Sequence, residues 1–299
     1  PGNTGLSSPV QIPGTTWTTV MTGSSSSDNT FSVTKTDGTL WMCGYNHKGQ
    51  LGQNNTTTYS SPVQIPGTTW PTSGEGKLRG ELNSGAIKTD GTLWMWGYNS
   101  DGTLGQNNRT DYSSPVQVPG TTWSKFGGGG QALGLKTDGT LWVWGANYYG
   151  SLGLNEGPGG PGWHENVKFR SSPTQLPGTW SEISGNNFCA AAIKTDGTLW
   201  AWGSNTYGFL GQNDTTNRSS PVQVPGTNWD KVKSGTGFNI AFKTDGTLWG
   251  WGYTSYGVLG INEGPGKYYS SPVQIPGTWV NSDYSFDVGS WNLFTLKSS

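Results

Sequence analysis

Five aspartates stand at the same place in a recurring heptapeptide, and they are the first residues of this chain that could do chemistry. Each lies within Lys-Thr-Asp-Gly-Thr-Leu-Trp, and neighbouring copies are 48 to 58 residues apart: Asp37, Asp90, Asp138, Asp196 and Asp245. Carboxylates can act as general acids and bases when a partner group lies within hydrogen-bond reach, but no distinctive partner recurs beside these. Aspartate before glycine is also what a tight turn prefers. We therefore interpret the five aspartates as turn residues.

The side chains that nucleophilic triads and zinc sites require are scarce in this chain. It has two histidines, His47 and His164, and two cysteines, Cys43 and Cys189, all at unrelated positions of the repeat. Cys43 occupies a slot that other copies fill with tryptophan, so we expect a buried free thiol there. The Asp- and Asn-rich loops lack a complete calcium-loop pattern, which leaves calcium as an open alternative. We predict no catalytic residue, no metal site and no cofactor.

Short β-strands carry these residues. In each copy two apolar runs are joined by Thr-Asp-Gly-Thr, a strong hairpin signal. A second motif, Ser-Ser-Pro-x-Gln-(Ile/Val/Leu)-Pro-Gly, occurs six times. Its prolines cannot donate to a ladder, which predicts an outer edge strand such as Pro272–Ile275. A tryptophan follows each of these motifs and opens another strand, as at Trp229, and no apolar stripe has helical spacing.

Four strands per unit of about 50 residues, in five to six units, predict an all-β fold, a β-propeller of four-stranded blades. We label the strands A to D, with the Asp-Gly turn between B and C. We expect a single propeller domain over residues 1–299. Its repeats lie at about 7–59, 60–112, 113–170, 171–218, 219–269 and 270–299, the last combined with the N-terminal strand.

The strands do not divide evenly into blades. Six A, six B and six D strands are expected, but only five C strands. Six blades would then require the last blade to join an N-terminal D strand, Ser8–Ile12, to the C-terminal A strand and the last B strand, Asn292–Lys297. An unpaired strand in a ring is costly, because backbone groups need partners. The alternatives are seven blades in a longer protein, or a strand lent by another chain.

The loop after each C strand resembles the regulator of chromosome condensation repeat. The motif Trp-Gly-x-Asn-x-x-Gly-Gln-Leu-Gly of that family matches Cys43–Gly52 and Trp96–Gly105 closely, whereas Thr254 replaces the asparagine in the last copy. The resemblance implies a propeller, in most members one of seven blades. The Gly-Gly-x-His motif common in the family is missing here. In style, the near-identical copies resemble repeat proteins of marine bacteriophages and bacteria.

Tryptophan arrays sense ultraviolet light in one branch of that family, but the 17 tryptophans of this chain call for a simpler interpretation. Fifteen of them fill repeat slots, and only Trp163 and Trp291 do not. In a propeller such periodic aromatic residues supply the core between blades. We therefore do not predict a photoreceptor.

Charge and hydropathy exclude two classes of partner. The formal net charge is −1, from 17 Lys and Arg against 18 Asp and Glu, whereas DNA-binding surfaces carry an excess of positive charge. No run of residues is apolar enough to cross a bilayer. We predict no nucleic acid partner and no membrane insertion.

Departures from the repeat mark the candidate binding residues, because a scaffold does not require them. Two C–D loops are unusual, Asn155–Phe169 and Asn262–Tyr269, and they should emerge on the same side of the disc. Aromatic side chains near Gly and Asn are typical of binding surfaces. The candidates are Trp163, His164, Glu165, Tyr148, Tyr149, Tyr268 and Tyr269.

These observations favour a non-enzymatic structural or binding module that displays loops from a rigid disc. We expect its partner to be a protein, such as an assembly neighbour, or a glycan, and its location to be a virion or the extracellular space. The alternative, which the family resemblance suggests, is a regulator that binds an enzyme or a GTPase. A glycan-active enzyme is less favoured, because no set of carboxylate, Tyr or His groups outside the repeat slots converges on the axis.

Overall fold

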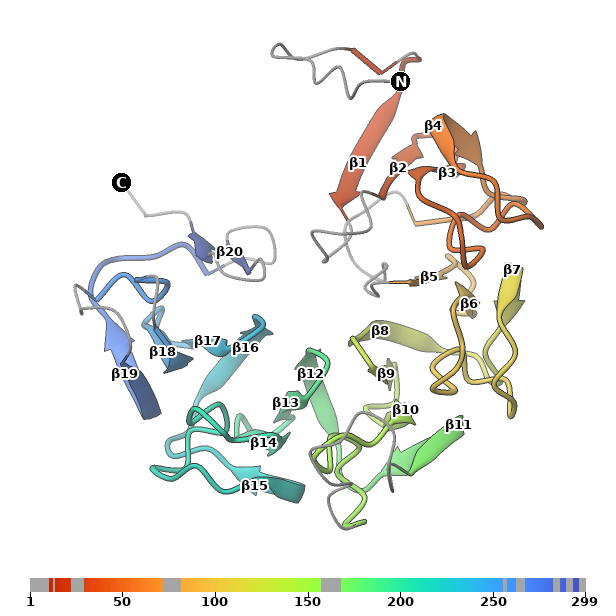
Figure 1. Cartoon of the computed structure of the whole chain (residues 1–299). Coiled ribbons are helices and arrows are strands. Elements are labelled where there is room, and N and C mark those ends of the chain that lie inside the picture. The colour runs from red at the N-terminus through yellow and green to blue at the C-terminus, as the bar shows by residue number, and fades with distance from the viewer. Residues whose placement is uncertain are drawn as a thin grey trace.

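The chain folds into sheets arranged around a central axis, with the inner strands near the centre and the outer strands at the rim (Figure 1). The computed structural model describes residues 11–12, 14–22, 30–71, 82–156, 168–254, 257–261, 267–281, 286–288 and 293–295. All strand pairs in this part of the chain are antiparallel, and no helix occurs in it. The predicted all-β propeller of four-stranded blades is confirmed.

Four sheets contain four strands each, paired in sequence order. The first sheet holds β1 (Trp17–Thr22), β2 (Phe31–Lys35), β3 (Leu40–Gly44) and β4 (Tyr59–Gln64), and another holds β8 (Trp123–Gly128), β9 (Gln131–Lys136), β10 (Leu141–Ala146) and β11 (Phe169–Leu176). The next holds β12 (Trp180–Gly185), β13 (Cys189–Lys194), β14 (Leu199–Gly203) and β15 (Arg218–Gln223). The last holds β16 (Trp229–Ser234), β17 (Phe238–Lys243), β18 (Leu248–Tyr253) and β19 (Tyr268–Ile275).

Two smaller sheets complete the described strands. One holds β5 (Asn83–Ile87), β6 (Leu93–Gly97) and β7 (Tyr112–Gln117), and the other holds β20 (Phe286–Val288) and β21 (Leu293–Thr295). Since β21 lies within the predicted last B strand, that strand is confirmed in its described part. The predicted N-terminal strand, Ser8–Ile12, lies mostly outside the described residues.

The proline-containing strands lie at the outer edge of each sheet, as predicted, because each of them pairs on one side only. β19 is longer than the predicted Pro272–Ile275. It begins at Tyr268 because a register shift between Gly250 and Gly252 lets the ladder resume with Gly252 opposite Tyr269.

The Asp-Gly motif closes the hairpin between B and C. In the first copy Gly38 has a φ of 77°, a left-handed conformation that glycine adopts without a steric penalty. The N–H of Lys35 donates to the carbonyl of Thr39 at 3.0 Å. The repeated Lys-Thr-Asp-Gly-Thr therefore encodes a short turn that fixes the register of every central hairpin.

The core lies between neighbouring blades rather than within one sheet. One apolar cluster joins Leu93, Met95 and Leu104 of one blade to Trp123 and Trp144 of the next. The tryptophan that opens strand A packs against the second tryptophan of strand C in the same blade, with ring centroids 5.9 to 6.2 Å apart. Each blade therefore completes its burial only against its chain neighbours.

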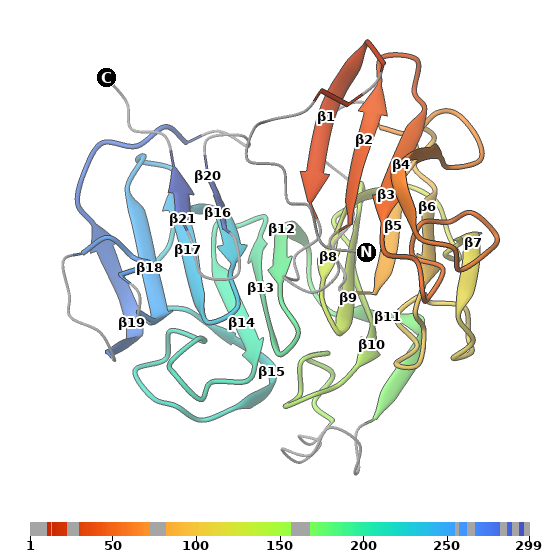
Figure 2. The same cartoon turned by 45° about the horizontal axis from the view of Figure 1, so that its top comes forward.

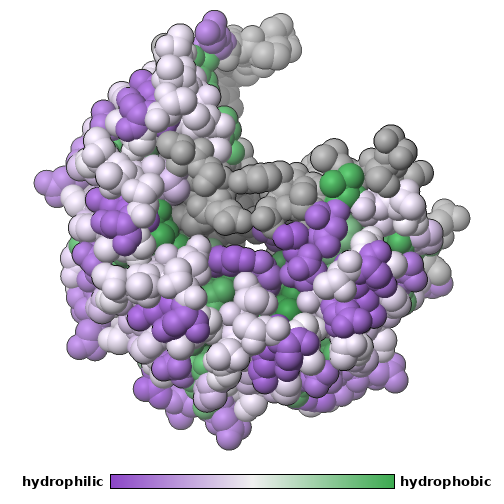
Figure 3. All heavy atoms as spheres, turned by 180° about the vertical axis from the view of Figure 1, so that it is seen from behind, coloured by the Kyte–Doolittle hydropathy of each residue, from purple (hydrophilic) through white to green (hydrophobic). Residues whose placement is uncertain are grey.

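Seen from behind, the apolar residues show as separate green groups among hydrophilic ones (Figure 3). Among the described residues, the large hydrophobic side chains that are exposed are Val20, Tyr45, Tyr207 and Tyr268. The described part of the chain contains no helix that could span a membrane.

Candidate functional site

The repeated aspartates are engaged in the hairpin turns, which confirms the turn interpretation. Asp138 Oδ1 accepts hydrogen bonds from the N–H of Thr140 at 2.9 Å and from its hydroxyl at 2.7 Å. The same two bonds form in the other four copies. The Thr140 hydroxyl, followed by its N–H, lowers the pKa of the Asp138 carboxyl below its usual range. A carboxylate held in this way is a poor proton acceptor near neutral pH.

The repeated lysine is equally accounted for. Lys136 Nζ lies 5.0 Å from the ring centroid of Trp123 and 4.8 Å from that of Trp142. An ammonium group between two indole rings gains cation–π attraction from both. The arrangement recurs in all five copies of the heptapeptide. The invariant residues therefore build the scaffold, and a site must be sought among the variable ones.

The A–B turns and the C–D loops leave the same end of each blade, because the four strands alternate in direction. We call this end of the propeller the loop face. In Figure 2 the long connection between β14 and β15 leaves the lower end of its blade. The C–D loops are the longest connections, so the loop face carries most of the variable surface.

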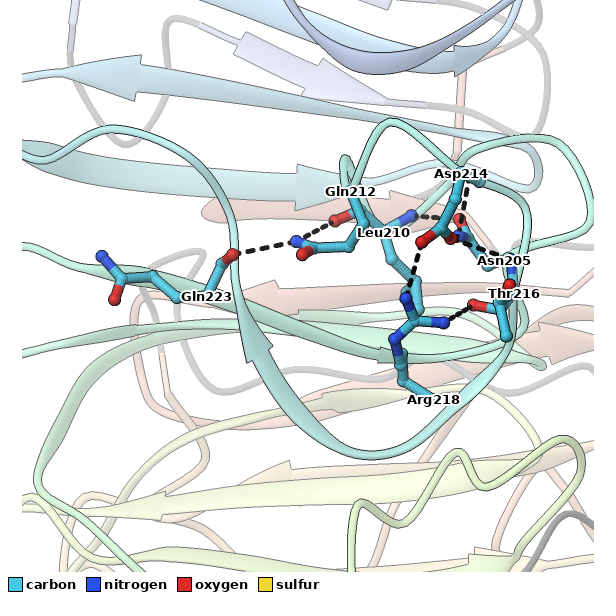
Figure 4. Close-up of polar contacts among 7 residues, drawn as sticks. All are labelled: Asn205, Leu210, Gln212, Asp214, Thr216, Arg218 and Gln223. Carbon is cyan, nitrogen blue, oxygen red and sulfur yellow. Dashed lines mark hydrogen bonds and ion pairs between the residues drawn. The ribbon is translucent and has the colours of Figure 1, made fainter.

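In four of the five C–D loops a buried asparagine accepts the backbone N–H of the leucine five residues later, as Asn205 does in Figure 4. Asn205 Oδ1 accepts the N–H of Leu210 at 2.9 Å, and its Nδ2 donates to the backbone carbonyl of Asp214 at 2.9 Å. Arg218 then donates to the Asp214 carboxylate at 2.6 Å and to the Thr216 carbonyl at 2.7 Å. The family-like asparagine thus pins both ends of the loop, and side chains on it are displayed with little freedom.

An aromatic cluster forms on the loop face where the fourth and fifth blades meet. Tyr207, from the loop after β14, lies with its ring centroid 5.1 Å from Tyr253 and 6.4 Å from Tyr268 of the next blade. Phe209 lies beneath it at 5.7 Å and is 8 % exposed. Tyr207 and Tyr268 are 46 % and 49 % exposed. We call Tyr207, Tyr253 and Tyr268 the tyrosine cluster.

The tyrosine cluster contains one residue from the sequence-based set and two that it missed. Tyr268 was a candidate, and its neighbour Tyr269 is partly buried against the same core. Tyr207 occupies a variable slot of the Gly-x-Asn-x-x-Gly motif, and only the packing of adjacent blades brings it against Tyr268. The signal that could have revealed Tyr207 is its loop position, which holds Lys48 and Asp101 in the first two copies and a tyrosine in each of the other three.

A second aromatic group lies one blade earlier. The rings of Tyr148 and Tyr149 lie 6.3 and 5.9 Å from that of Phe188 on the next blade. Tyr148 is buried, and burial, aided by nearby Asp101, raises the pKa of its phenol to about 12. Tyr149 has a φ of 55°, which is strained for a bulky residue. The predicted pair is therefore brought together, but with less exposed surface than the tyrosine cluster.

The remaining candidates, Trp163, His164 and Glu165, lie outside the described residues. The structure does describe the base of their loop, where Arg170 pairs with Glu156 and the N–H of Asn147 donates to the carbonyl of Lys168 at 3.1 Å.

The cysteines and the possible metal ligands of the described residues do not form a recognisable site. Both cysteines are buried and free, as predicted. Burial raises the pKa of Cys43 to about 11 and that of Cys189 to about 12. In this part of the chain no three His, Cys, Asp or Glu side chains are grouped to hold a metal ion. Asp111, which belongs to one of the Asp- and Asn-rich loops, accepts the N–H of Asn99 at 2.8 Å.

Two family models match parts of this chain. The model of the regulator of chromosome condensation (RCC1) repeat matches residues 37–71, 90–131 and 196–242, and a second model of that repeat matches 181–208. The matched stretches contain three of the five Asp-Gly turns, at Asp37, Asp90 and Asp196, and the loops held by Asn46, Asn99 and Asn205.

Two similar proteins come from Arabidopsis thaliana. The ultraviolet-B receptor UVR8 is 26 % identical over 204 residues, which cover 63 % of this chain and 42 % of the receptor. The mitochondrial RCC1 domain-containing protein RUG3 is 29 % identical over 198 residues, covering 63 % of this chain and 43 % of that protein. The matches therefore span less than half the length of these relatives.

Solved structures confirm the fold. Human WBSCR16 superposes with a TM-score of 0.73 at 20 % identity, covering 90 % of this chain and 70 % of that one. Yeast RCC1 (Prp20), crystallised with Kap60, gives a TM-score of 0.71 at 16 % identity, covering 91 % and 65 %. At such low identity the likeness is one of architecture.

Proposed function

We propose that this chain, which is an RCC1-like repeat β-propeller, acts as a non-enzymatic regulator that binds a protein partner through the tyrosine cluster on its loop face. The observation that carries the proposal is the meeting of Tyr207 and Tyr268 from adjacent blades, each about half exposed. Tyrosine offers a large rigid contact area at a small entropic cost, and it is enriched in protein interfaces.

The rigidity of the loop supports binding by a preformed surface. Tyr207 lies between Asn205 and Leu210, whose hydrogen bond at 2.9 Å fixes the loop beneath it. Phe209 supports the ring from below. A surface that is already ordered loses little conformational entropy on binding.

The similar proteins agree with this class of function. Yeast RCC1 was crystallised bound to a protein, Kap60, and UVR8 is named as a receptor. The partner of this chain is therefore proposed to be a protein, and a glycan stays a prediction of the sequence. Its location in a virion or outside the cell also stays a prediction.

Site-specific photocrosslinking tests the proposal in the native setting. A benzophenone amino acid placed at position 207 should capture a protein, whereas the same group at Tyr45 should not. Tyr45 is a matched control because it is 47 % exposed and makes no ring contact recorded in the described region. With the captured protein purified, Tyr207→Ala should weaken binding about tenfold or more, which equals ~1.4 kcal/mol.

Three outcomes would contradict the proposal. Equal capture from positions 207 and 45 would show that the tyrosine cluster is not the contact. Saturable binding of an oligosaccharide, lost in Tyr207→Ala, would favour the glycan alternative. Turnover of a glycan by the purified chain would show that it is an enzyme.

A further inference from the structure

The β16–β19 blade has one side that faces away from the β12–β15 blade. Part of its C–D loop is exposed on that side, whereas the matching parts of the preceding C–D loops are buried. We call the side turned away from the β12–β15 blade the free side. Its C–D loop contains Gly257 and Gly260, both exposed, whereas the matching Gly208 and Gly211 of the preceding blade are buried. The same two positions are buried in the three earlier loops as well: Gly49 and Gly52, Gly102 and Gly105, and Gly150 and Gly153.

The backbone of the next blade covers the internal copies. A Cβ added to Gly208 would lie 2.5 Å from the Cα of Ser270, which begins the outer strand motif of the next blade. The corresponding distances are 2.5 to 2.8 Å in the three earlier copies: Gly49 to Ser113, Gly102 to Ser171 and Gly150 to Ser219. A Cβ on Gly257 would meet no atom of the described residues within 4 Å.

A tryptophan of the next blade completes each internal contact. Trp251 Nε1 donates to the carbonyl of Phe209 at 2.8 Å, and both residues are buried. The three earlier junctions repeat this bond at 2.6 to 2.9 Å: Trp96 to Gln50, Trp144 to Thr103 and Trp202 to Ser151. The matching carbonyl on the free side belongs to Val258, and no donor to it occurs among the described residues.

The two-stranded sheet beside this blade has an edge without a partner among the described strands. β20 contacts β16, and β21 pairs with β20. The other edge of β21 has no partner among the described strands. In the four complete blades that edge pairs with the C strand. In three of these blades the C strand carries the donating tryptophan, and in the β1–β4 blade Cys43 stands in its place. An unpaired edge is a template for another strand.

We propose that the free side binds a protein segment with the chemistry of this repeat: a Leu-Trp-x-Trp-Gly strand, its loop, and an outer strand beginning Ser-Ser-Pro. The first strand pairs with the free edge of β21. Its second tryptophan donates Nε1 to the carbonyl of Val258, and the serine backbone covers Gly257. The four internal junctions identify this occupant, because the free side continues the same interface.

A synthetic peptide tests the proposal. The probe spans Thr195 to Pro225 of this chain, which contains the C strand, loop and D strand of a complete blade. We expect saturable binding to the full chain by calorimetry and a higher thermal midpoint at saturation. A peptide with Trp202→Ala should bind about tenfold more weakly or worse, because it cannot donate the indole hydrogen bond. Failure of the unaltered peptide to bind, or equal binding by both peptides, would overturn the proposal.

Glycine substitutions provide the matched control in the protein. Gly260→Asn should leave the thermal midpoint unchanged and abolish peptide binding, because its side chain would fill the space that the indole needs. Asparagine tolerates the φ of 64° at this position. Gly211→Asn should lower the thermal midpoint, because its Cβ would lie 3.3 Å from Trp251 Nε1. Gly257→Asn is a second blocking variant.

Two results separate this proposal from others. Tyr207→Ala should bind the peptide normally, so the free side and the tyrosine cluster can fail independently. Concentration-dependent self-association in sedimentation velocity that Gly260→Asn abolishes, without peptide binding, would identify a second copy as the occupant and overturn the proposal.

Discussion

Removing the asparagine that pins a C–D loop should destabilise the propeller by about 2–4 kcal/mol. In Asn205→Ala the N–H of Leu210 loses its acceptor at 2.9 Å, and the Asp214 carbonyl loses its donor at 2.9 Å. Asn205 and Leu210 are both 0 % exposed, so water cannot replace the lost partner. An unsatisfied buried N–H costs about 1–3 kcal/mol, and the second bond contributes about 1 kcal/mol.

Urea unfolding followed by tryptophan fluorescence and circular dichroism measures this loss. The midpoint should fall while the slope with denaturant stays constant, since the surface exposed on unfolding is the same. Thr215→Ala is the control, because Thr215 is exposed on the same loop, and a surface change of this kind costs less than about 0.5 kcal/mol. A loss in Asn205→Ala no larger than that of the control would refute the role of the asparagine.

Three further predictions follow from the scaffold. Trp202→Phe should lower the free energy of unfolding in urea by about 1–3 kcal/mol, because the buried carbonyl of Ser151 loses its indole donor at 2.9 Å. An unchanged free energy of unfolding would show that the bond between blades does not stabilise the fold. Cys43 and Cys189, whose pKa values burial raises to about 11 and 12, should not react with a thiol reagent at pH 8 until urea unfolds the chain. The pKa of Asp138 is lowered in the fold, so its charge stabilises the fold above about pH 4, and this contribution is lost as the pH falls through the lowered value; Asp138→Asn should lose less stability than the wild type between pH 6 and 2.

Much of the fold could be predicted because the same turn and strand motifs recur in successive repeats. The Asp-Gly turn and the prolines of the outer strands identified the hairpin and the edge of each blade, and Lys136 and Asp138 confirm this at atomic level. The start of β19 at Tyr268 was missed, because a register shift at Gly252 depends on pairing across strands and leaves no local mark.

The site was harder to predict than the scaffold. Sequence reasoning found Tyr268 because its loop departs from the repeat, but it passed over Tyr207 inside a regular copy. Their contact depends on how one blade packs against the next, and this information is not contained in either loop alone. Variable positions within regular copies are therefore as informative as irregular loops.

The indole bonds between blades also bear on how the chain folds during synthesis. They join residues only 41 to 51 positions apart, so a new blade can dock as soon as about one further repeat has left the ribosome. At roughly 5–20 residues per second, 50 residues take about 2.5–10 s, whereas a β-hairpin forms in about 1–10 μs. Each blade thus has ample time to settle on its predecessor, and at the growing end only the newest blade is incompletely packed at any moment.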